Sequence, residues 1–478
     1  MFDNPLIRRY RYSLMRPRQF WIYMAIYIAL LIMLFFINYT GFKHGLMYKT
    51  FGALYRSIYY QLLVIQVLVL WVWGSFNASS AIKEEVFEKT YDFFRVLPIP
   101  ARAKAVGILV GKNLVVLFLA AINLVLLLLF GLIGEVKTIL LGQVVLVLAC
   151  VAILANSVAL LSSINPKGKR KKGSIVGFIL LAFFLGPMII NGLIEFAKVK
   201  NIETIMARFF ELKLPIMVLT SLVVLYFSCW SIKGILRKFT REDEPLFTRF
   251  GALLFMVGYE FVLFGLFYPY ISDISYYPEL GARAINCMYW LISLFAVLAV
   301  PLASVRSFDR YLEMGGLVRK RTGRRMGVLR LLTHSNLLLA LALFAIWAAV
   351  AALTTHLAKL DMLYHLRVMA VFLSFYLFLI LLVEVYVVVS PYAAKVRILL
   401  IFIVGVYAIF PLILGGLFDS DQLYLHSPFG YVFDMFGRVD QDINAQVTVI
   451  AVNLLLCAVP LAIVLKRHRQ VITARQKM

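Results

Sequence analysis

Long apolar segments separated by short polar ones dominate the pattern along the chain. A helix needs about 20 apolar residues to cross the hydrocarbon core of a bilayer. The pattern predicts twelve such spans, at 20–40, 57–79, 103–133, 138–163, 174–196, 214–236, 249–271, 285–307, 335–357, 363–389, 396–418 and 445–466. We therefore expect an all-α, polytopic helical membrane protein. The third run is unusually long, and Lys112 and Asn113 indicate that its first turns lie at the membrane surface.

A charged stretch, Ala81–Pro100, lies between the second and third apolar runs. Pro98 and Pro100 end it, because proline cannot continue a helical hydrogen-bond ladder. As a helix it gathers its apolar residues on one side and its acidic residues on the other. The apolar set is Ile82, Val86, Phe87, Phe93, Phe94 and Leu97. The pattern predicts a short amphipathic helix on the membrane surface, with its polar face toward a soluble partner.

The first 19 residues combine five arginines with helically spaced apolar residues. The arginines are Arg8, Arg9, Arg11, Arg16 and Arg18, and the apolar residues are Leu6, Ile7, Tyr10 and Leu14. This composition predicts an interfacial helix whose arginines meet anionic lipid headgroups. A signal that retains the N-terminus on the cytoplasmic side explains the same charges. No cleavable signal peptide is expected.

Composition supports a membrane protein, with 63% hydrophobic residues among 478 and a mean hydropathy of +0.90. The net charge of +24 reflects membrane topology rather than nucleic-acid binding, because the basic residues concentrate in particular loops. Segments 164–173 and 308–334 are rich in Lys and Arg, whereas 419–444 carries five Asp against one Arg. This bias predicts that both termini lie in the cytoplasm. We expect the chain to lie in a plasma or inner membrane.

Matched spacing predicts two parallel six-span halves. The first comprises residues 1–236, with the interfacial helix and the 81–100 helix; the second comprises residues 249–478. A charged, proline-containing linker at 237–248 joins them. The outer segments 197–213 and 423–436 are amphipathic or aromatic, and we interpret them as re-entrant helices.

No catalytic constellation, metal site or bound cofactor is predicted for this chain. Gly107 and Gly111-Lys112 lack the spacing and the Ser/Thr of a phosphate loop. The six histidines are scattered and the four cysteines lie in apolar runs, so neither a metal centre nor a disulfide framework is expected. We therefore expect the chain not to be an enzyme.

Few ionisable residues lie within the predicted spans, and they include Glu260 and Glu384. A buried carboxylate marks a possible proton or substrate path. The alternative is structural: Glu260 bonds a neighbouring tyrosine, and Glu384 pairs with Lys395 or Arg397. The amides within spans are predicted to form interhelical hydrogen bonds. They are Asn113, Asn123, Gln143, Asn156 and Asn453.

The stretch from residue 81 to 113 resembles the cytoplasmic region of type-2 ABC exporter permeases. The similarity rests on its acidic residues, Lys89-Thr90, Leu97-Pro98, Arg102, Gly107 and Gly111-Lys112. Asn4-Pro5, Arg8 and Arg16-Pro17-Arg18 before the first span also resemble these permeases. The similarity covers about the first 115 residues.

The resemblance implies a coupling helix that docks on a separate ATPase subunit, expected in two copies, where ATP and Mg²⁺ bind. The residues expected to face the ATPase are Glu84, Glu85, Glu88, Asp92 and Arg95, and the expected anchors beneath the helix are Phe87, Tyr91 and Phe94. The family unit has six spans and dimerises. This chain is therefore either a fused pseudo-dimer or an enlarged subunit that pairs with a second permease chain.

Two other functions fit parts of the pattern. A twelve-span secondary transporter driven by an ion gradient also has parallel six-span halves, and Glu260 is its candidate intramembrane site. A membrane enzyme acting on lipid or polyprenyl substrates ranks last, because Asp419 and Asp421 lack a basic partner set. The sequence does not select a transported substrate.

Overall fold

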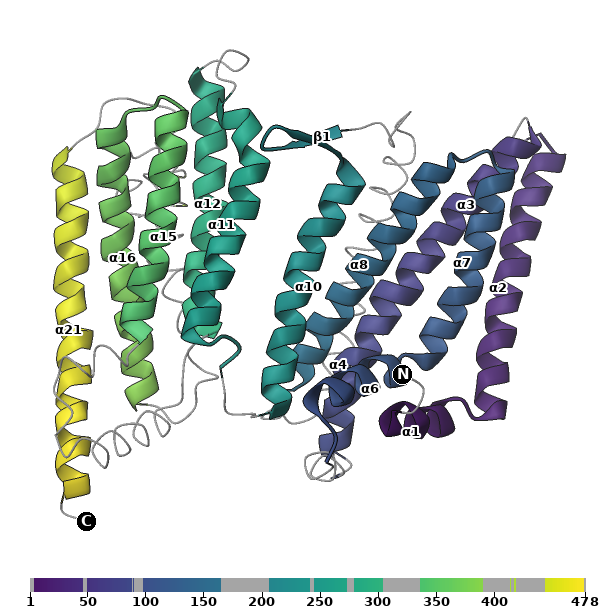
Figure 1. Cartoon of the computed structure of the whole chain (residues 1–478), viewed down its shortest axis with the longest axis horizontal. Coiled ribbons are helices and arrows are strands. Elements are labelled where there is room, and N and C mark those ends of the chain that lie inside the picture. The colour runs from purple at the N-terminus through teal and green to yellow at the C-terminus, as the bar shows by residue number, and fades with distance from the viewer. Residues whose placement is uncertain are drawn as a thin grey trace. The chain divides into compact units, whose positions relative to one another are not determined.

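Helices make up nearly all of the described chain (Figure 1). The computed structural model describes residues 4–45, 50–87, 98–164, 206–240, 245–272, 279–303, 336–389 and 443–476, with Lys89, Ile413 and Leu417. Within these ranges, ten helices are long and apolar enough to cross a membrane. The all-α, polytopic prediction is confirmed, and the helices indicate a multi-pass membrane protein. The spans predicted at 174–196 and 396–418 lie almost wholly outside the described residues.

The chain separates into two compact units, which are described in turn. The first comprises Met1–Ala207 and Lys213–Glu244, and the second comprises Arg208–Leu212 and Pro245–Met478. The division near residue 244 falls within the predicted linker. The proposal that the units are permease halves stays a prediction.

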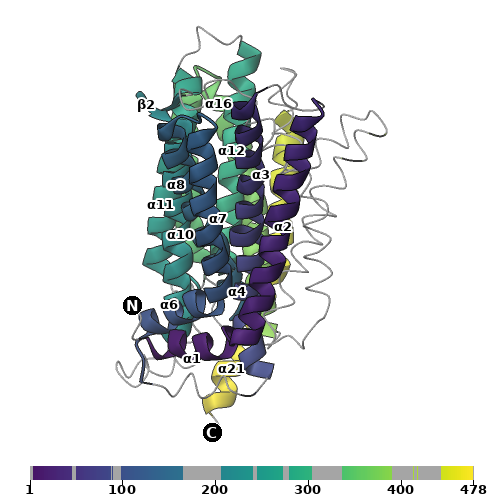
Figure 2. The same ribbon diagram turned by 90° about the vertical axis from the view of Figure 1, so that its right-hand side faces the viewer.

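The first unit contains a set of long helices with two short ones at one end (Figure 2). Its elements are α1 (Pro5–Leu14), α2 (Pro17–Lys43), α3 (Phe51–Val67), the π-helical turn η1 (Leu68–Trp73), α4 (Gly74–Phe87), α6 (Ala101–Lys112), α7 (Leu114–Ile133), α8 (Thr138–Ser163) and α10 (Ile216–Thr240). Helices α1 and α6 are the short ones, and they lie across the ends of the long helices.

The third apolar run is divided in the structure. Asn113 separates α6 from α7, so that only α7 spans. The predicted span from residue 103 was therefore too long, although its polar start had indicated such a division.

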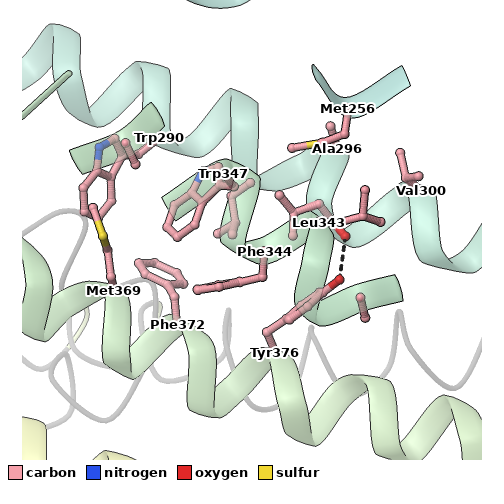
Figure 3. Packing of buried hydrophobic residues seen from close by; sticks show 14 of the residues in the cluster. Met256, Trp290, Ala296, Val300, Leu343, Phe344, Trp347, Met369, Phe372 and Tyr376 are labelled. Atoms are coloured by element: carbon pink, nitrogen blue, oxygen red, sulfur yellow. Dashed lines mark hydrogen bonds between the residues drawn. The ribbon is translucent and has the colours of Figure 1, made fainter. Parts of the chain in front are cut away.

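The second unit contains α11 (Arg249–Ser272), α12 (Glu279–Ala303), α15 (Asn336–Leu357), α16 (Met362–Val389) and α21 (Ile443–Gln476). Its core is aromatic: Trp290 and Trp347 meet edge to face at 5.3 Å, and Phe344 packs on Trp347 at 5.0 Å (Figure 3). The Tyr376 hydroxyl donates to the Val297 carbonyl at 3.1 Å. These large rings join α12, α15 and α16 by area and by ring geometry.

Part of the predicted re-entrant segment 197–213 has a different structure. Residues from 206 onward form two short strands, β1 (Met206–Phe209) and β2 (Leu212–Pro215), rather than a helix. Phe210 has a left-handed backbone (φ 51°), which reverses the chain direction. Its amide donates to the Gly265 carbonyl at 2.8 Å. Residues 197–205 and 423–436 lie outside the described residues.

A buried polar network joins α2, α3 and α7 in the first unit. Asn123 accepts a hydrogen bond from the Tyr27 hydroxyl at 2.7 Å. Its amide nitrogen donates to Gln66 at 2.6 Å and to the Leu62 carbonyl at 2.9 Å. Gln66 in turn donates to the Ala120 carbonyl at 3.1 Å. Because every member has a partner, the network fixes three spans against one another.

Replacing Asn123 should therefore destabilise the first unit. We expect Asn123→Leu to lower the free energy of unfolding by about 1–2 kcal/mol, because it removes the acceptor of the Tyr27 hydroxyl and the donor to Gln66 Oε1. Denaturant unfolding in detergent measures this. Val125→Leu, at an exposed position of the same helix, is the control. Equal stability of the two variants would contradict the role of the network.

Candidate functional site

The second span and the start of the predicted coupling helix form one continuous helix. Residues Phe51–Phe87 run through α3, η1 and α4 without a break. The prediction of a separate helix beginning at residue 81 is therefore corrected over residues 81–87. Ala81 and Ile82 are buried in the first unit, which explains why the span does not end at residue 79.

Three of the predicted coupling residues fall in this described helix. They are Glu84, Glu85 and Phe87. Glu88, Tyr91, Asp92, Phe94 and Arg95 lie outside the described residues. We call residues 83–87 the α4 tip.

Helices α1 and α6 pack closely because two glycines of α6 lie beneath α1. A Cβ atom on Gly107 would come within 2.8 Å of Leu6 Cβ, and one on Gly111 within 2.5 Å of Tyr10 Cδ2. Asn4 adds a hydrogen bond to the Ala103 carbonyl at 2.7 Å and caps α1 through the Leu6 amide. The spacing of four residues puts both glycines on one face of α6, the arrangement that lets helices approach closely.

Glu85 is held beneath α1 by two side chains. Its carboxylate accepts hydrogen bonds from Arg9 Nη2 and from the Tyr10 hydroxyl, each at 3.1 Å. Glu85 is only 7% exposed, whereas the sequence had predicted that it faces a partner subunit. A carboxylate at this depth needs such partners, because its desolvation is costly.

Tyr10 shares this environment. Burial, and then the charge and hydrogen bond of Glu85, raise the pKa of the Tyr10 phenol well above its usual value. Tyr10 therefore stays protonated as the donor to Glu85. The Lys112 ammonium lies 5.7 Å from the centre of the Tyr10 ring, within cation–π distance.

Glu84 forms a second ion pair with Lys112 of α6. The α4 tip is thus tied to α1 through Glu85 and to α6 through Glu84. These two ion pairs, with the Gly107–Gly111 contact, constitute what we call the brace. Lys83 and Phe87 of the tip are exposed, Phe87 to 62%, and the Glu84 side chain stays 42% exposed beside its ion pair with Lys112.

The brace connects to the π-helical turn through amides. Asn113, directly after α6, donates to Asn156 of α8 at 3.4 Å. Asn156 donates to the Leu70 carbonyl within η1 at 3.4 Å and to the Ala152 carbonyl at 2.7 Å. Gly74 lies so close to Asn156 that a Cβ atom would come within 2.8 Å of its Oδ1. Polar contacts therefore reach from the end of α6 into the second span.

The sequence interpretation missed four members of the brace: Arg9, Tyr10, Gly107 and Gly111. The two glycines were noted as a failed phosphate loop and as part of the family resemblance, whereas their four-residue spacing was the available signal of helix packing. The partner of Glu85 is 76 residues away, and no local pattern identifies it.

The second unit holds the other predicted polar site. Glu260 of α11 is 2% exposed and accepts hydrogen bonds from Tyr289 and Ser293 of α12. The expected hydrogen bond to a tyrosine is therefore present, and it joins α11 to α12. A role for Glu260 in a proton or substrate path stays a hypothesis.

The other intramembrane amides differ in their contacts. Asn453 donates to Ser374 at 3.0 Å, which joins α21 to α16. Gln143 Oε1 has no hydrogen-bond partner among the described residues. Lys395 and Arg397, the predicted partners of Glu384, lie outside those residues. Within the same ranges no cluster of His, Cys, Asp and Glu is arranged to hold a metal ion.

Comparisons with protein-family models, with curated proteins and with solved structures gave no match to this chain.

Gly111 gives a direct test of the brace. We expect Gly111→Ala to lower the free energy of unfolding by about 1–3 kcal/mol, because the new methyl group overlaps the Tyr10 ring. It should also speed tryptic cleavage at the arginines of α1. Gly142→Ala is the matched control, since nothing lies within 4 Å of its added Cβ. If both variants behave alike, the close packing of α1 on α6 is contradicted.

Glu260 gives a test of the second site. Glu260→Gln retains an acceptor for Tyr289, so we expect a loss of less than about 1 kcal/mol in stability. Glu260→Leu leaves two buried hydroxyls without their acceptor and should cost about 1–3 kcal/mol. Thermal unfolding in detergent measures both, with Val257→Leu at an exposed position of α11 as the control. A Gln variant as unstable as the Leu variant would point to a requirement for the charge itself.

Proposed function

We propose that this chain is the permease subunit of an ATP-driven ABC exporter, and that a separate ATPase subunit docks at the α4 tip. ATP and Mg²⁺ would bind on that subunit, which is expected in two copies. The proposal places both termini in the cytoplasm and the chain in a plasma or inner membrane. It leaves the choice between a fused pseudo-dimer and a pair of permease chains open.

One observation carries this proposal: the second span continues into a braced tip that exposes Lys83 and Phe87. A helix that is free at its end would bend when pushed. The brace holds the tip through the ion pairs of Arg9 with Glu85 and of Lys112 with Glu84. A force applied to the tip would then move the helix as a rigid body.

In this proposal, movement of the α4 tip changes the packing of the second span at the π-helical turn η1. Such turns interrupt the regular hydrogen-bond ladder and occur frequently at functional sites. Asn156 bonds the Leu70 carbonyl of η1 at 3.4 Å and lies against Gly74 directly after it. In the proposal, displacement of the α4 tip alters this contact and hence the packing of the second span against α8.

The second candidate is a secondary transporter driven by an ion gradient. Glu260 favours it, because a buried carboxylate within a span is a typical proton or ion site. Its two hydroxyl partners, however, already satisfy it structurally. Export that persists after ATP depletion and stops when the proton or sodium gradient collapses would favour this candidate over an ABC exporter.

Phe87 tests the docking site. The tagged full-length chain is purified from its native membranes, and co-purified ATPase is measured by nucleotide hydrolysis and mass spectrometry. We expect Phe87→Ala to reduce the co-purified ATPase about tenfold, because exposed aromatic side chains dominate interface energies.

Phe51→Ala is the matched control. Phe51 lies at the opposite end of the same continuous helix and is 57% exposed, so its loss should leave ATPase recovery unchanged. The proposal is overturned if no ATPase co-purifies with the unaltered chain, or if the two variants lower its recovery equally.

A further inference from the structure

Four arginines surround the junction between α1 and the first span. Arg8 and Arg11 lie three residues apart on α1, and Arg16 and Arg18 flank Pro17, where α2 begins. All four side chains are exposed, and none makes an ion pair with another described residue. The group therefore presents four exposed positive charges, which we call the arginine patch.

The apolar face of α1 is not available to insert into a bilayer. Leu6, Ile7 and Tyr10 are buried within the first unit, where Leu6 and Tyr10 lie over Gly107 and Gly111. Arg9 is committed to Glu85. What α1 offers to its surroundings is thus its cationic side, with the Tyr12 ring 68% exposed beside it.

The arginine patch directly adjoins an apolar helix that faces outward. Trp21, one turn into α2, is 66% exposed. Many apolar side chains further along α2 are also exposed, including Ile26 and Phe36. An apolar surface of this kind is favourable against the hydrocarbon of a bilayer. Exposed aromatic rings followed by a long apolar helix mark the headgroup level of a membrane, so the four arginines lie at the depth of lipid phosphates.

From this placement, we propose that the arginine patch is a binding site for the headgroup of an anionic phospholipid. Guanidinium groups bind phosphate oxygens through paired hydrogen bonds, and juxtamembrane clusters of basic residues favour anionic over zwitterionic lipid. Charge complementarity and the adjoining lipid-facing helix select lipid over a soluble anion. The site is independent of the proposed ATPase contact, because it shares no residue with the exposed α4 tip.

Trp21 reports on this site. The full-length chain is reconstituted in phosphatidylcholine vesicles that contain brominated phosphatidylglycerol or brominated phosphatidylcholine. Quenching of Trp21 is taken as the difference between the unaltered chain and Trp21→Phe. We expect the anionic lipid to quench at about fivefold lower mole fraction than the zwitterionic lipid. The preference should disappear near 1 M salt, where the Debye length falls to about 3 Å.

Two quadruple variants identify the residues. Replacing Arg8, Arg11, Arg16 and Arg18 by glutamine should abolish the preference, and replacing them by lysine should retain most of it. Lys43→Gln, at the other end of α2, should leave it unchanged. The salt titration tests the proposal even if the glutamine variant does not fold.

A preference that survives the glutamine changes or high salt would overturn the proposal. An unchanged lipid preference with lost ATPase recovery would show instead that the arginines face a protein. Lost lipid preference with normal ATPase recovery supports the lipid site alone. Failure of either proposal is therefore distinguishable from failure of the other.

Discussion

The arrangement of the first unit depends on one buried carboxylate. Glu85 lies at the end of a span, where removal from water is costly, and hydrogen bonds from Arg9 and Tyr10 compensate that cost. Both come from α1, so α1 must lie across the α4 tip. Gly107 and Gly111 then allow α6 to approach α1 closely enough for Lys112 to reach Glu84.

This electrostatic requirement also determines which surfaces are available to partners. Because the apolar residues of α1 are used inside the unit, its arginines face outward. Glu85 is buried in the brace and Glu84 is paired with Lys112, so Lys83 and Phe87 are the most accessible residues of the tip, with part of the Glu84 side chain beside them. The chain thus has two exposed surfaces of different chemistry. The arginine patch beside the first span is cationic, and the α4 tip at the end of the second span combines the Phe87 ring with Lys83.

Hydropathy predicted the spans well, since apolar length alone decides whether a helix can cross a bilayer. The helical spacing of Leu6, Ile7, Tyr10 and Leu14 likewise predicted the helix that the structure shows as α1. The end of the second span could not be predicted in the same way. The charges at 83–85 led us to end the second span at residue 79. Partners distant in sequence make it favourable for the helix of that span to continue through these charges. The hydrogen bond between Glu260 and a tyrosine was anticipated, because a buried carboxylate has few other solutions.

The π-helical turn η1 changes the direction in which the side chains of α4 point. A turn of this kind holds one residue more than an α-helical turn, and each residue advances the helix by about 100°. Gly74–Phe87 is therefore rotated by that angle relative to an uninterrupted α3. This rotation contributes to the direction in which Glu85 meets Arg9. The angular setting of the α4 tip is thus fixed within the second span, more than ten residues before Glu85.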